Sequence, residues 1–148
     1  MIRGSRLLRV VETAERLPPG LQPPFWGALL GMAVTAGLIF ACVPLWLLQG
    51  RTDIPAAVLD MVVAGLASGA AGGAIALILG GLRNAGPLGY YALWIIANGG
   101  AALIFLGLLR LFGRGEVLGL DRAFAPLVVA GLGALNGLIV ARALGRSG

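Results

Sequence analysis

The stretch VVAGLASGAAGGAIALILG, residues 62–80, contains no charged side chain and places glycines at Gly65, Gly69 and Gly73. A helix of about 20 apolar residues, rising about 1.5 Å per residue, crosses a hydrocarbon core about 30 Å thick. Because residues four apart lie on one helix face, these glycines predict a groove in which a second helix packs closely. The stretch therefore predicts a glycine-lined transmembrane helix.

Three other parts of the chain are equally apolar, and arginine lies in every gap between them. Asp60 is the only charged residue inside any of the four stretches. Charged residues make up 11% of the chain, against about 25% in a typical soluble domain. We therefore predict an all-α integral membrane protein with a cytoplasmic N-terminal segment, residues 1–24, and a four-helix transmembrane domain, residues 25–148. The expected transmembrane helices cover residues 25–48, 54–82, 88–109 and 123–141.

The charges are distributed unequally between the two ends of these expected spans. The end that carries both termini holds seven arginines and two glutamates, whereas the opposite end holds four arginines and four acids. Cytoplasmic loops carry the excess of basic residues in membrane proteins. We therefore expect both termini to be cytoplasmic. A chain without lysine and rich in arginine, glycine, alanine and leucine is typical of a bacterial genome of high GC content, which predicts the inner membrane of a bacterial cell.

The N-terminal segment predicts a short amphipathic helix. Residues 5–17 place apolar and polar side chains on opposite helix faces, Pro18-Pro19 ends the helix, and residues 21–24 predict a stiff turn. We expect this helix to lie at the membrane interface or to pack on a neighbouring subunit. Nucleic-acid binding is not expected, because Glu12 and Glu15 dilute the positive charge. The apolar face comprises Leu7, Val10, Val11, Ala14 and Leu17, and the polar face Arg6, Arg9, Glu12, Thr13 and Arg16.

Two halves of the chain show similar segments in the same order. Residues 37–40 (GLIF) match residues 102–105 (ALIF), and residues 62–66 (VVAGL) match residues 128–132 (VVAGL). This pattern predicts a tandem duplication of one helical hairpin, whose copies are related by an axis along the membrane normal. Chance matching in an alphabet dominated by Leu, Ala, Gly and Val is the alternative.

Glycines and a few polar residues are the candidate functional positions within the spans. The glycines recur at intervals of four residues, as in a glycine zipper, and predict close helix packing. The polar residues predict one layer at a common depth, formed either by interhelical hydrogen bonds or by a pathway or ligand site. The helix-packing candidates are Gly27, Gly31, Gly65, Gly69, Gly73, Gly133 and Gly137. The candidates for the polar layer are Thr35, Asn98 and Asn136.

The composition argues against catalysis. The chain has no His, no Lys and a single cysteine, Cys42, and no acid lies near the middle of a span. Neither an activated nucleophile nor a set of metal ligands is therefore expected, and no cofactor can be named. The acids Asp53, Asp60, Glu116 and Asp121 lie at one end of the spans, where such residues are usually solvated or can bind a cation.

The function expected from the sequence is that of a non-catalytic multi-pass membrane subunit that packs within a larger complex through glycine-rich helix faces. Its expected partners are the lipid bilayer and other membrane subunits or further copies of itself. The alternative is a small homo-oligomeric channel or transporter for a small solute or ion, with its polar layer at Thr35, Asn98 and Asn136.

Overall fold

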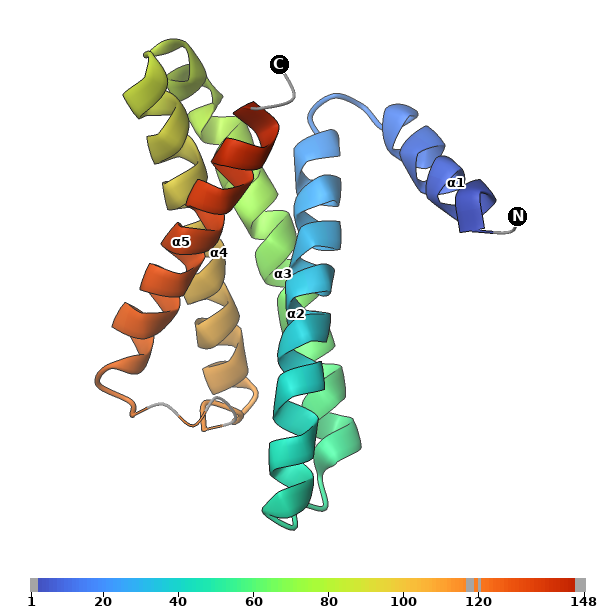
Figure 1. The fold of residues 1–148 in the computed structure, drawn as a ribbon, viewed down its shortest axis with the longest axis vertical. Helices are drawn as coiled ribbons and strands as arrows, with labels where there is room; N and C mark the ends of the chain where they lie inside the picture. The colour runs from blue at the N-terminus through green and yellow to red at the C-terminus, as the bar shows by residue number, and fades with distance from the viewer. Residues whose placement is uncertain (1–2, 117–118, 120, 146–148) are drawn as a thin grey trace.

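The structure of the chain is a computed structural model that describes residues 3–116, 119 and 121–145. These residues form helices joined by short turns and one longer loop between the last two helices (Figure 1). The helices are α1 (Arg3–Glu15), α2 (Gln22–Leu48), α3 (Ile54–Ile78), the 3₁₀ helix η1 (Leu79–Asn84), α4 (Pro87–Leu111) and α5 (Ala125–Gly145).

Four helical segments among the described residues are long and apolar enough to cross a membrane. They are α2, α3 together with η1, α4 and α5. The prediction of an all-helical chain with four candidate membrane spans is thus confirmed, and it indicates a multi-pass membrane protein.

The helix boundaries differ from the expected ones near prolines. Residues 21–24 were expected to form a turn, but α2 begins at Gln22 and includes Pro23 and Pro24. Proline is tolerated in the first helical turn because the N–H groups there have no intrahelical acceptor. Pro55 and Pro87 likewise occupy the first turns of α3 and α4.

The four long helices pack in the order of the chain. Helix α2 contacts α3, α3 contacts α4, and α4 contacts α5, while no Cα atom of α2 comes within 8 Å of α4 or α5 among the described residues. Figure 1 shows two hairpins, α2–α3 and α4–α5, that meet through α3 and α4. Among the four long helices, α3 and α4 therefore have two neighbours each, whereas α2 and α5 have one each.

The main core lies near the turn between α2 and α3 and joins three helices. It contains Trp46 from α2, Met61 from α3, and Phe105 and Leu109 from α4. By their positions in the sequence, the residues that fit interfacial aromatic belts are Trp26, Trp46, Tyr90, Tyr91 and Trp94. Trp46, however, is only 3% exposed within the chain, so its side chain faces the core and not lipid. Its indole packs into the core, and the guanidinium carbon of Arg51 lies 5.8 Å from its ring centroid.

The matched segments of the two halves lie in different surroundings. Phe40 is 85% exposed, whereas Phe105 is 7% exposed. Gly65 is enclosed by α2, whereas a Cβ at Gly131 would have no neighbouring atom within 4 Å. The duplication therefore stays a prediction from the sequence, since equivalent positions do not make equivalent contacts.

Helix α1 lies apart from the other helices. Among the described helices it contacts α2 only. Figure 1 shows it turning outward from the start of α2, at the end of the molecule where α5 also ends. Ala14 is buried at its C-terminal end, while Leu8 is 69% exposed.

Candidate functional site

Glycines of α2 and α3 face each other along the contact between these helices. A Cβ at Gly27 would lie 3.0 Å from the amide nitrogen of Gly73, and one at Gly31 would lie 2.9 Å from the Cα of Gly69. A Cβ at Gly69 would in turn lie 3.0 Å from the Cα of Gly31 and would collide with the carbonyl oxygen of Gly27. The two backbones therefore touch where a larger residue does not fit.

The same contact extends towards both ends of α3. At one end, a Cβ at Gly65 would overlap the side chain of Thr35, which is 2% exposed. At the other end, a Cβ at Gly73 would lie 2.7 Å from the Cα of Pro24. Three glycines of α3, at intervals of four residues, thus face α2.

A second face of α3 meets α4 through another glycine. A Cβ at Gly72 would lie 2.8 Å from the Cβ of Ala101 and 3.2 Å from the carbonyl oxygen of Ala97. Gly72 was not among the candidate packing residues, because its place beside Gly73 in the sequence did not show that two helices bind opposite faces of α3.

The contact between α4 and α5 also depends on close backbone approach. A Cβ at Gly133 would lie 3.0 Å from the Cα of Gly99, and one at Gly137 would lie 2.9 Å from the Cα of Ile95. All seven candidate glycines therefore lie where helices of this chain meet. Their contribution to stability stays a prediction.

A hydrogen-bonded pair of asparagines joins α4 to α5. The Nδ2 of Asn136 donates to the Oδ1 of Asn98 at 2.8 Å, and the Nδ2 of Asn98 donates to the carbonyl oxygen of Trp94 at 2.9 Å. Thr35 lies instead between α2 and α3, against Gly65. The structure thus brings together two of the three candidates for the polar layer and places the third in another helix contact.

Trp94 contributes a polar group of a different kind. Its carbonyl oxygen accepts the hydrogen bond from Asn98, while its indole Nε1 is buried without a hydrogen-bond partner in the described part of the chain. A buried N–H group without an acceptor usually destabilises a fold, so a hydrogen-bond acceptor placed against this indole would stabilise it.

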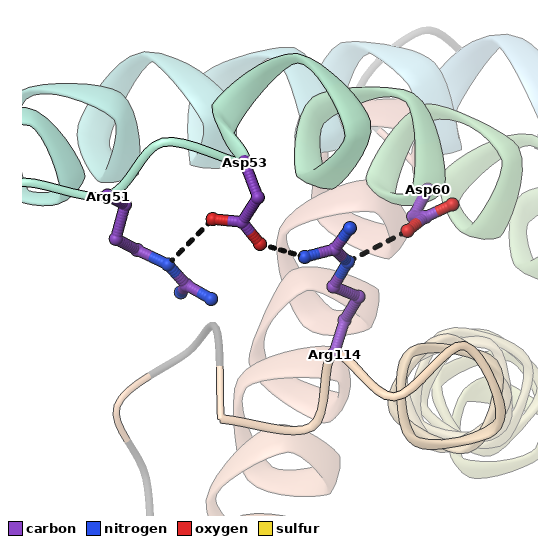
Figure 2. Close-up of polar contacts among 4 residues, drawn as sticks. All are labelled: Arg51, Asp53, Asp60 and Arg114. Carbon is purple, nitrogen blue, oxygen red and sulfur yellow. Dashed lines mark hydrogen bonds and ion pairs between the residues drawn. The ribbon is translucent and has the colours of Figure 1, made fainter.

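Charged residues at the end of the spans opposite the termini form a network that was not predicted from the sequence. Figure 2 shows Arg114, from the loop after α4, reaching between two aspartates of the first hairpin. Its Nε donates to Asp60 at 2.9 Å, and its Nη1 donates to Asp53, which also accepts a hydrogen bond from Arg51 at 3.2 Å. Asp53 and Asp60, expected to be solvated or to bind a cation, are therefore held by arginines.

The position of this network explains why it was missed. Asp53 immediately precedes α3, whereas Arg114 follows α4, so 61 residues separate the two in the sequence. The turn before α3 and the loop after α4 each carry both acidic and basic residues, which was the available signal. Nothing in the sequence showed which arginine contacts which acid. The result is an ionic link between the two hairpins.

The network changes the titration of its members that lie outside the spans. Desolvation acts to raise the pKa of Asp53, but the hydrogen bond from Arg114 and the charge of Arg51 outweigh it, and the pKa of Asp53 is lowered. The hydrogen bond to Asp60 likewise raises the pKa of Arg114, against the effect of desolvation. Both groups are therefore charged at neutral pH and attract each other.

Two hollows lie at the same end, near the loop after α4. One has a cavity volume of about 420 Å³, and the other, beside Trp46 and Arg51, has a volume of about 120 Å³. Neither is lined by Thr35, Asn98 or Asn136. Within the described ranges, no group of three or more His, Cys, Asp or Glu side chains is placed to hold a metal ion. The larger hollow is lined by Arg110, Gly113, Gly115, Glu116 and Arg122.

No protein-family model, curated protein or solved structure matches this chain.

Replacing Gly69 by Ile should separate α2 from α3, because the added side chain meets the backbone of α2 at Gly27 and Gly31. Overpacking of this kind costs about 1–3 kcal/mol or more, which should appear as a lower unfolding free energy in detergent and altered migration on a native gel. The matched control is Gly107→Ile in α4, because a Cβ at Gly107 has no atom within 4 Å. Unchanged assembly of Gly69→Ile would contradict the packing role.

Replacing Arg114 by Gln should lower the thermal midpoint of the purified protein, because both Asp53 and Asp60 lose a cationic donor. The fall should shrink at high salt, since these charges are partly exposed and are screened. Arg83→Gln, an exposed arginine in η1, is the control and should leave the midpoint unchanged. An equal effect of both substitutions would show that Arg114 acts only through net charge.

The lowered pKa of Asp53 predicts that acid weakens the link between the hairpins. A carboxyl group whose pKa is lower in the folded state stabilises the fold fully above its unfolded pKa, which is about 3.9. That contribution is lost as the pH falls through the lower, folded value. Thermal midpoints measured from pH 7 to below about pH 4 should therefore fall more in the native protein than in Asp53→Asn. Parallel curves for the two proteins would disprove the contribution of Asp53.

Proposed function

We propose that this chain is a non-catalytic multi-pass membrane subunit that packs within a larger membrane complex. The observation that carries this proposal is the hydrogen bond between Asn136 and Asn98. The side chains of Asn98 and Asn136 are two of the few polar groups in the spans, and their hydrogen bond joins α4 to α5. Asn98 also binds the backbone carbonyl of Trp94. Interhelical hydrogen bonds in membranes hold helices together, at about 0.6 kcal/mol on average.

The glycine contacts support the same role in a modified form. Gly27, Gly31 and Gly69 pack helices within the chain, in the manner of a glycine zipper, so they are not available to a neighbouring subunit. The outer helices each leave a face uncovered, and a Cβ would meet no atom within 4 Å at Gly37 of α2 or Gly131 of α5. We place the contacts with other subunits on these outward faces.

The proposed setting is the inner membrane of a bacterium, with both termini in the cytoplasm. The excess of arginine at the end with the termini supports this orientation. Helix α1 is the proposed interfacial helix, since its only helix neighbour among the described residues is α2. The proposed origin of the transmembrane part is duplication of a hairpin, which its two successive hairpins and the matched segments support.

The second candidate function is a small homo-oligomeric channel or transporter for a small solute or ion. The unpartnered indole N–H of Trp94 favours it, because a solute with a hydrogen-bond acceptor would satisfy that group. In this case, several copies would have to enclose a path that includes Thr35, Asn98 and Asn136.

Purification from native membranes in a mild detergent, followed by mass spectrometry, tests the subunit role. We expect unlike membrane proteins to co-purify with the native chain in fixed proportion, because its outward helix faces bind them. The chain reconstituted alone in liposomes should show no solute or ion flux. A homo-oligomer whose flux is abolished by Asn98→Leu, but not by the control Asn84→Leu in η1, would overturn the proposal in favour of the channel.

A further inference from the structure

We infer that α1 binds an anionic phospholipid surface, through arginines on one face and exposed aliphatic side chains on the other. This inference rests on the interfacial placement of α1 proposed above and adds the kind of lipid that the helix selects. It does not depend on whether the chain is a subunit or a channel.

The exposure of α1 agrees with a helix that needs a surface to cover it. Leu8 and Val11 are exposed, although α1 packs Ala14 against the rest of the chain. Arg9 and Arg16 are exposed as well, and Arg16 donates to Glu12 at 2.9 Å. An ion pair this exposed is screened by water and salt, so Arg16 can exchange it for a lipid phosphate at little cost.

Charge distinguishes this end of the molecule from the other. Helix α1 contains three arginines and two glutamates in its sequence, Arg16 follows it directly, and exposed Arg83 and Arg142 lie at the same end of the spans. At the opposite end Arg51 and Arg114 are held by Asp53 and Asp60 (Figure 2), and the charges there sum to zero. Only the end with α1 is therefore complementary to anionic headgroups.

Aromatic pairs place α1 at the depth of the headgroups. Phe25 and Trp26 lie near the start of α2, and Tyr90 and Tyr91 lie near the start of α4. In each pair the two rings lie edge to face, with their centroids 5.8 Å apart. Tryptophan and tyrosine gather at membrane interfaces. The turn before α2 holds α1 at this level, because Gln22 Nε2 donates to the carbonyl oxygen of Leu17 at 3.1 Å. Figure 1 shows α1 extending sideways from this point.

The test uses the full chain with a fluorescent label at Leu8→Cys in a Cys42→Ser background, because Cys42 is the only cysteine. The protein is reconstituted in vesicles of phosphatidylcholine alone or with phosphatidylglycerol, each containing a lipid-borne quencher. We expect stronger quenching with phosphatidylglycerol. Arg9→Gln should lower the ratio of embedded to free α1 about fivefold, as expected for one arginine at an anionic surface. Arg9→Lys should leave this ratio unchanged. Arg122→Gln, at the opposite end of the molecule, is the matched control.

The outcomes separate the two levels of the inference. Equal quenching in both kinds of vesicle would overturn the selection of anionic lipid and leave the interfacial placement standing. No quenching in either would overturn the interfacial placement as well. Neither result bears on co-purification with other subunits, which tests the proposed function separately.

Discussion

The close approach of α2 and α3 at Gly27, Gly31 and Gly69 is the constraint on which the rest of the architecture depends. Apolar side chains gain little by leaving lipid for each other, so membrane helices must associate through short-range van der Waals contact and hydrogen bonds. Glycine permits that contact because a backbone without a Cβ can meet another backbone directly. A hairpin packed in this way leaves the opposite face of α3 free to receive α4.

The other interactions extend this arrangement and define its two ends. Gly72 admits α4 on the second face of α3, and the asparagine pair joins α4 to α5. Arg114 then links the loop after α4 to the start of α3. At one end of the molecule, ion pairs thus neutralise the charges, while the other end carries an excess of positive charge and helix α1. This asymmetry underlies both the proposed orientation and the proposed affinity for anionic lipid.

The sequence predicted the helices well because their signal is local. Apolar stretches bounded by arginine identified four spans, and the glycine spacing identified residues that lie at helix contacts. Among the features that escaped it, three concern tertiary contacts. Trp46 resembled an interfacial residue but belongs to the core, Thr35 lies apart from the asparagines, and Arg114 reaches acids far away in the sequence. Each of these features depends on which helices are neighbours. A helix with Leu, Ala and Gly on all of its faces does not specify its neighbours.

What the sequence determined by itself was the presence of four apolar segments long enough to span a membrane, the approximate helix positions and the unequal charge of the two ends, because these follow from hydropathy and from the order of residues along the chain. The tertiary structure alone decided that packing runs in chain order, that Trp46 of α2 shares a core with Phe105 and Leu109 of α4, and that matched positions such as Gly65 and Gly131 have different surroundings. The physical reason is that helix faces in lipid are chosen by shape and by a few polar contacts between distant residues, which no local pattern records.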